Sequence, residues 1–261
     1  MARLPALFIS HGSPMLAIQK TPAHQFLLNL GKTLPRPTGI VVASAHWESV
    51  GAPAVTLATK PETIHDFGGF PQALFDIQYP APGAPAVASR AAALLAQEGF
   101  AVKTSAMRGL DHGAWVPLSL MYPEADIPVT QVSVLRDSTP RSHLQIGRAL
   151  SHLRDEGVLV IGSGSLTHNL YEFRGHAIDA PAPEWVSDFG EWMKDRLESS
   201  DEEALINYRD KAPSAVRNHP TEEHLLPLFV AMGAAGKDPQ GKRLHGSYEY
   251  GLLAMDVYAF E

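Results

Sequence analysis

Three histidines of the chain each follow a short apolar run that has the composition of a buried β-strand. They are His11 after residues 6–10, His46 after residues 40–45, and His168 shortly after residues 158–162. In an open parallel sheet the carboxyl ends of the strands share one edge, and ligands bind in the crevice there. One such histidine is commonly just a hydrogen-bonded loop residue. Three together predict a metal site with nitrogen donors.

A fourth candidate ligand, His224, lies in the segment 218–227, which reads NHPTEEHLLP. Thr221 can cap a helix predicted over residues 221–232, with Glu222 and Glu223 in its first, positively polarised turn. His224 would then lie near the loop that enters this helix. The alternative is an ordinary capped helix without chemistry, and the spacing is not the His-Glu-x-x-His of zincins.

Four other histidines differ in their surroundings. His112, between Asp111 and Gly113 before a predicted helix, has the placement of an acid–base group, although simple loop packing is the alternative. His65 belongs to an aromatic loop, residues 63–70, that could cover an aromatic substrate. His143 and His152 lie in residues 142–156, which have the pattern of an amphipathic helix, and we expect both at the surface.

The chain has no cysteine, which excludes disulfides, thiolate zinc sites and iron–sulfur clusters. Any metal must therefore bind imidazole, carboxylate or water, a donor set that suits Fe(II), Mn(II) or Zn(II). Templates for other reactions are missing: residues 162–165 (GSGS) do not form a Gly-x-Ser-x-Gly elbow. No Walker motif and no Gly-x-Gly-x-x-Gly fingerprint follows a strand. A metal is the expected source of reactivity.

Short β-branched runs alternate along the chain with longer helical patterns. Strands are predicted at residues 6–10, 39–45, 54–58, 101–105, 128–134, 158–162 and 252–260. Helices are predicted at residues 85–98, 114–121, 142–156, 183–198, 201–208 and 221–232. Several strands are apolar throughout, which is typical of strands buried on both faces. We expect an α/β fold, with a mainly parallel central sheet flanked by helices on both faces and a last strand that could be antiparallel.

Composition predicts one globular domain over residues 1–261, because 45% of the residues are apolar and 19% charged, with no linker or repeat. The formal net charge of -7 disfavours nucleic acid and anionic membranes as partners. The longest apolar stretch, residues 225–236, is shorter than the roughly 18 residues of a membrane span. No secretory signal pattern precedes residue 11. A cytoplasmic location is expected.

Several motifs at matched spacing resemble one enzyme family from about residue 5 to the end of the chain. They are residues 8–14 (FISHGSP), 44–47 (SAHW), 64–71 (IHDFGGFP), 79–83 (YPAPG), 111–113 (DHG), 168–169 (HN) and 223–227 (EHLLP). In this order they resemble the DOPA 4,5-dioxygenase-like branch of the class III, LigB-type extradiol ring-cleavage dioxygenases.

The resemblance implies a metal site formed by His11, His46 and His224, with His168 as a fourth ligand or as the nearby acid–base residue. His112 would be a catalytic histidine outside the ligand set. Glu222 and Glu223 stay open as alternatives to His224, which is favoured. One divalent ion is implied per chain, Fe(II) for activity or Zn(II) as isolated.

The implied reaction is metal-dependent opening of a catechol-type, DOPA-like ring by O2, with bidentate binding of the catecholate and histidine acid–base catalysis. This reaction belongs to aromatic compound metabolism. The implied partners are a small aromatic diol and O2, and the chain would act as a monomer or homodimer.

Two other functions use the same residues. A zinc-dependent hydrolase would employ the same histidine ligands with metal-bound hydroxide as the nucleophile. A non-catalytic binding protein would keep the metal only for structure. Structural sites usually have tight local ligand spacing, whereas these histidines are scattered over most of the chain.

Overall fold

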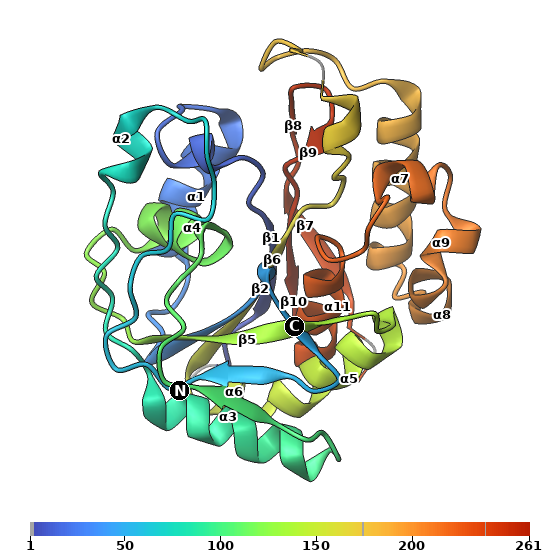
Figure 1. Ribbon diagram of the computed structural model, residues 1–261. Coiled ribbons are helices and arrows are strands. Elements are labelled where there is room, and N and C mark those ends of the chain that lie inside the picture. The colour runs from blue at the N-terminus through green and yellow to red at the C-terminus, as the bar shows by residue number, and fades with distance from the viewer. Residues whose placement is uncertain (1–2, 174, 238) are drawn as a thin grey trace.

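A central sheet of eight strands organises the computed structural model, which describes residues 3–173, 175–237 and 239–261 (Figure 1). Its strand order is β4-β3-β5-β2-β6-β1-β10-β7. The strands are β1 (Ala6–Ser10), β2 (Gly39–Val50), β3 (Ala54–Thr56), β4 (Lys103–Ser105), β5 (Val129–Arg136), β6 (Val158–Gly164), β7 (Gly241–His245) and β10 (Val257–Phe260). A separate two-stranded hairpin pairs β8 (Tyr248–Glu249) with β9 (Leu253–Ala254).

The middle of the sheet is parallel, as the apolar strand pattern predicts. Strands β5, β2, β6 and β1 pair in parallel. Antiparallel pairs extend the sheet at both sides: β10 and then β7 next to β1, and β3 next to β5, while β4 pairs in parallel with β3. The expected antiparallel last strand is confirmed as β10. The fold is therefore a single-domain α/β fold with a mostly parallel, mixed sheet.

Helices cover both faces of the sheet. The helices are α1 (Pro22–Thr33), α2 (Gln72–Phe75), α3 (Pro85–Gln97), α4 (His112–Met121), α5 (Pro140–Leu150), α6 (His152–Asp155), α7 (Glu184–Glu198), α8 (Glu202–Ile206), α9 (Tyr208–Lys211), α10 (Ala215–Asn218) and α11 (Leu226–Ala235), with 3-10 turns η1 (Pro14–Ala17) and η2 (Leu170–Glu172). One core holds α1 and α4 against Leu7 and Ile9 of β1, and the other holds α3, α5, α7 and α11 against Phe8. Side chains of β1 alternate between the two cores, as strand geometry requires.

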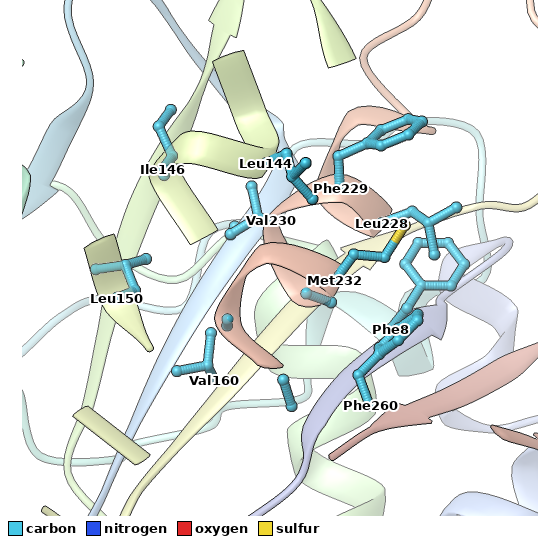
Figure 2. Packing of buried hydrophobic residues seen from close by; sticks show 14 of the residues in the cluster. Phe8, Leu144, Ile146, Leu150, Val160, Leu228, Phe229, Val230, Met232 and Phe260 are labelled. Atoms are coloured by element: carbon cyan, nitrogen blue, oxygen red, sulfur yellow. The ribbon is translucent and has the colours of Figure 1, made fainter. Parts of the chain in front are cut away.

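Helix α11 is buried at every residue, so it forms the centre of the second core (Figure 2). Figure 2 shows its side chains between strands β1, β6 and β10 and helix α5. Glycines allow the two helices to approach closely, because a Cβ on Gly147 would lie 2.1 Å from the Val230 oxygen, and one on Gly233 would lie 2.1 Å from the Leu144 oxygen. This packing fixes α11, and with it the turn that carries His224.

Most predicted elements are present, but the structure differs from the prediction at several places. The predicted helix 142–156 is divided into α5 and α6, and the predicted helix 221–232 begins only at Leu226. Helix α1, capped by the Thr21 side chain, and strand β7 were not predicted. Among the described residues, the structure has no helix that is both long and apolar enough to cross a membrane.

Candidate metal centre and catalytic cavity

Three of the predicted ligands meet at the carboxyl edge of the parallel strands. One ring nitrogen from each of His11, His46 and His224 lies within 4.8 Å of the others. His11 directly follows β1, as expected. His46 lies inside β2 rather than beyond its end, in a stretch where the pairing of β2 with β5 jumps from Ser44 to Glu48. At this irregularity residues 45–47 do not pair with β5, and His46 lies near the carboxyl ends of the neighbouring parallel strands.

The hydrogen bonds around His11 determine which of its nitrogens carries the proton. Ser163 Oγ donates to the Gly113 carbonyl oxygen, so its own proton is used there. Ser163 Oγ therefore accepts from His11 Nδ1–H, at 2.9 Å. The lone pair of His11 is left on Nε2, which lies 3.0 Å from Nε2 of His46. Strand β6 thus orients a ring supplied by β1.

His224 is oriented by its neighbour in the sequence. Its Nδ1–H donates to Glu223 Oε1 at 2.9 Å, which leaves the Nε2 lone pair free. Glu222 points elsewhere, because its carboxylate accepts a hydrogen bond of 2.8 Å from the Tyr208 hydroxyl. Of the three candidates in this segment, His224 is the one grouped with His11 and His46. A carboxylate behind a ligating imidazole is a common arrangement in metalloproteins.

The position of His224 depends on a close backbone contact, not on the helix cap expected at Thr221. The residue lies in the turn before α11, and its carbonyl oxygen accepts from the Ser165 amide at 2.9 Å. A Cβ on Gly164 would lie only 2.0 Å from this oxygen. The glycine at the end of β6 therefore allows the turn to approach the sheet.

His112 is the first residue of α4, and two aspartates surround it. Asp111 is fully buried, caps α4 through the Ala114 amide and accepts from Arg108, Gln131 and Ser44. Asp66 Oδ1 accepts from both the backbone amide and Nδ1 of His112, each at 3.0 Å. The second oxygen of Asp66 lies 3.5 Å from His46 Nδ1.

The charge state of this group follows from burial. Burial, reinforced by the neighbouring histidines, lowers the pKa of His11 and His224 well below the usual value. Burial, together with the charge of His112, lowers the pKa of His46 to about 4. Burial would raise the pKa of Asp66, but hydrogen bonds and charge from His112 outweigh it and lower the pKa to about 2. His11, His46 and His224 are therefore neutral at neutral pH, which is the form of histidine that binds metals.

The donor set fits a divalent metal ion. Two nitrogens bound to one ion at about 2.0–2.1 Å lie at most about 4.2 Å apart, and the 3.0 Å between His11 Nε2 and His46 Nε2 is within that limit. The proton of His11 is fixed on Nδ1, so its Nε2 lone pair points at His46. A cation between the two nitrogens would make this approach favourable.

His168 is predicted to be either a fourth metal ligand or an acid–base residue. Its ring stacks on His224, with centroids 3.5 Å apart and planes 9° from parallel. One possible ligand atom of His168 lies within 4.8 Å of such atoms of Glu223 and His224. This set is distinct from the set formed by His11, His46 and His224. The His168 backbone amide donates to the Asn218 carbonyl oxygen. Burial is the main cause that lowers the pKa of His168 to about 4.

A cavity of about 610 Å³ opens in front of these rings. It is lined by Gly12, Ser13, Pro14, Met15, His46, Asp66, Phe67, Phe70, His112, His168, Leu170, Phe173, His224, Tyr250 and Leu253. The loop around residues 64–71 contributes two aromatic rings, as expected. His65 itself does not line the cavity, because its Nε2–H donates to the Ile77 carbonyl oxygen and anchors the loop from behind.

The predicted surface position of His143 was wrong. His143 is fully buried instead of exposed, because its Nε2 accepts from the Leu135 amide and its Nδ1–H donates to the Thr139 carbonyl oxygen. Burial lowers its pKa to about 4. His152 is exposed, as predicted. The sequence did not indicate the roles of Asp66, in the motif of residues 64–71, and Ser163, in residues 162–165.

The chain is similar to known proteins over nearly its whole length. A family profile described as the catalytic LigB subunit of aromatic ring-opening dioxygenase matches residues 5–260. The 4,5-DOPA dioxygenase extradiol of Beta vulgaris is 45% identical over 97% of this chain and 95% of its own length. The protein of the same name from Escherichia coli (strain K12) is 44% identical over 97% and 93%. The crystal structure of uncharacterized protein JW3007 from Escherichia coli K12 superposes with a TM-score of 0.81, at 35% identity, covering 99% of this chain and 100% of that chain.

Proposed function

Because the chain belongs to the LigB family of aromatic ring-opening dioxygenases, it is an extradiol ring-cleaving dioxygenase, and we propose that it opens the ring of a DOPA-like catechol. The observation that carries this proposal is the group of three imidazoles, His11, His46 and His224, beside a cavity with aromatic walls. The names of the curated relatives support DOPA as the first substrate to test.

We assign the metal to Nε2 of His11, His46 and His224, with Fe(II) as the active ion and Zn(II) as an inactive replacement. When bound, Fe(II) supplies Lewis acidity toward the diol and one-electron chemistry toward dioxygen, whereas zinc has no accessible redox change. Ser163 and Glu223 keep the protons of His11 and His224 on Nδ1, so that their lone pairs are available on Nε2.

The substrate ring is proposed to lie between Phe67 and Phe70 on one wall and Leu170 and Phe173 on another. All four side chains line the cavity, whose volume is in the range of about 300–1,000 Å³ typical of small-molecule sites. Apolar walls exclude water from the reacting ring and strengthen the polar interactions at its diol end. They also favour a flat aromatic ring, because aromatic side chains pack well against other rings.

Proton transfer is assigned to His168 and His112, which line the cavity beside His224 and His46. The ring centroids of His112 and His46 are 3.9 Å apart, and those of His46 and His224 are 4.9 Å apart. With His168 stacked on His224, the four rings form a row with an acid–base candidate at each end. His168 is neutral at pH 7, so it can accept a proton from one hydroxyl of the diol.

The test is oxygen uptake by protein reconstituted anaerobically with Fe(II). With DOPA or a related catechol, addition of oxygen should give stoichiometric uptake and a yellow ring-opened product. The zinc-loaded protein should consume no oxygen and, under anaerobic conditions, should cleave no ester or amide. A failure of the iron-loaded protein to consume oxygen with any member of a broad catechol panel would refute the proposal.

A further inference from the structure

The side chain of Asp66 makes a two-point contact with His112. Its Oδ1 accepts from the backbone amide and from Nδ1 of His112, both at 3.0 Å. The His112 side chain is 7% exposed and that of Asp66 is 23% exposed, so the imidazole end of this bond is shielded from water. An ionised carboxylate can only accept hydrogen bonds, and therefore Nδ1 of His112 must carry the proton.

This contact has a consequence for the other nitrogen of the ring. A neutral imidazole has one N–H and one lone pair, so a proton held on Nδ1 leaves the lone pair on Nε2. In free neutral histidine the opposite tautomer, with the proton on Nε2, is the more abundant one. Asp66 thus selects the less common form of His112, and that form can accept a proton or a hydrogen bond at Nε2.

We propose that Asp66 is a positioning residue that fixes the tautomer and orientation of His112 and so presents a basic Nε2 in the catalytic cavity. The inference depends on the proposed function only in so far as His112 takes part in ring cleavage. Asp66 is assigned no contact with the reacting ring. It acts through His112.

The loop that carries Asp66 is held in place on both sides. Before it, the Ile64 amide donates to the Leu110 carbonyl oxygen at 2.8 Å, and Trp115 Nε1–H donates to the Ile64 carbonyl oxygen at 2.9 Å. After it, the Phe67 ring meets the His112 ring edge to face, with centroids 5.6 Å apart. The carboxylate is therefore presented by a fixed segment, which is the condition for controlling the orientation of another side chain.

A purely structural role for Asp66 would be to cap α4, since it accepts the amide of the first helical residue. That helix already has an N-cap, because the Asp111 side chain accepts from the Ala114 amide at 3.2 Å. Removal of the Asp66 carboxylate should therefore leave α4 and the fold intact. The two roles differ in what they predict for the imidazole of His112.

The test is the tautomer of His112 measured by 15N NMR in zinc-loaded protein labelled at histidine, with the signal assigned from a His112→Gln variant. The wild-type ring should carry its proton on Nδ1. Asp66→Ala should shift the population toward the Nε2–H form, whereas Asp66→Asn keeps an acceptor oxygen and should retain the Nδ1–H form. A wild-type ring with its proton on Nε2, or no change of tautomer in Asp66→Ala, would overturn the inference.

Kinetics of the same variants, loaded with Fe(II), give a second readout. Loss of the partner that orients a metal-ligating histidine typically reduces activity about 10–100-fold, and by analogy we expect a similar factor for His112. Asp66→Ala should lower kcat by this factor with little change in KM, and Asp66→Asn should recover part of the loss. Metal content is measured in each variant, because Asp66 also lies 3.5 Å from His46. The matched control is Asp76→Ala, in the same part of the chain, whose exposed carboxylate accepts a hydrogen bond from the Gln72 side chain.

The two readouts separate this inference from the proposed function. If the tautomer changes in Asp66→Ala while ring opening proceeds at the wild-type rate, Asp66 positions His112 but His112 has no catalytic role. If kcat falls with the tautomer unchanged, the positioning inference is wrong and the proposed function stands.

Discussion

Gly164→Ala is the substitution that tests most sharply how the fold brings the histidines together. Gly164 ends β6, and its carbonyl oxygen accepts from the His11 amide at 2.9 Å. On its other side, a Cβ would lie 2.0 Å from the carbonyl oxygen of His224 and 3.1 Å from the carbonyl carbon. One methyl group would therefore separate the two segments that carry His11 and His224.

The size of the displacement follows from these distances. Real Cβ contacts essentially never fall below 3.0 Å, so the His224 carbonyl must move by about 1 Å or β6 must shift by as much. Coordination distances tolerate only about 0.2 Å. We expect affinity for a divalent ion to fall at least about 10–100-fold, by analogy with the loss of a supporting partner. Overpacking should also lower the free energy of unfolding by about 1–3 kcal/mol.

The assay is competition for Zn(II) against a chromophoric chelator, combined with urea unfolding of the metal-free protein. Gly162→Ala is the matched control for strain, because its Cβ would also lie 2.0 Å from a carbonyl oxygen, that of Pro227, but farther from the ligand. It should destabilise the fold similarly and weaken metal binding less. Gly68→Ala, with open space around its Cβ, should change neither quantity.

Wild-type metal affinity in Gly164→Ala would refute this reasoning. Equal loss of affinity in Gly162→Ala and Gly164→Ala would also contradict it, because the effect would then come from general strain in α11 and not from displacement of His224.

Three further predictions concern separate parts of the molecule. Ser163→Ala removes the acceptor of His11 Nδ1–H, so Zn(II) affinity measured by chelator competition should fall about 10–100-fold, and an unchanged affinity would contradict this. Buried His143 has its pKa lowered to about 4 from 6.5, so the stability it contributes is complete above pH 6.5 and is lost as the pH falls toward 4. Urea unfolding should show wild type losing about 2 kcal/mol more than His143→Gln between pH 7 and pH 5, and equal losses would contradict it. Phe70→Ala removes a ring from the aromatic wall of the cavity, and we expect the substrate to lose about 1–2 kcal/mol of binding free energy. KM for a catechol should then rise about 5–30-fold, whereas an unchanged KM would place the substrate ring elsewhere.

The convergence of His11 and His46 could be predicted because it depends on a regular rule. Apolar strands that run in parallel bring their carboxyl ends to one edge, and β1 and β2, which carry these residues, begin at their predicted positions on either side of β6. The start of α11 could not be predicted in the same way. Thr221 and its acidic neighbours form a good capping pattern, but Glu222 binds Tyr208 instead, and the helix begins at Leu226.

Contacts between distant segments account for what the sequence did not indicate. Asp66 lies in an irregular loop 46 residues before its partner His112, and no periodic pattern connects such positions. His143 has the spacing of an amphipathic helix, which does not specify which polar residue satisfies a buried amide. In the fold that amide belongs to Leu135, at the end of β5. Such side-chain bonds to buried backbone groups become visible only in three dimensions.

The central claim is that Nε2 of His11, His46 and His224 hold one metal ion at which the catechol is opened. The most direct test is a crystal of protein loaded anaerobically with Fe(II), measured at the iron absorption edge. We expect one anomalous peak per chain, within about 2.3 Å of all three Nε2 atoms. A peak on His168 and Glu223 instead, or none at full iron occupancy in solution, would contradict the account.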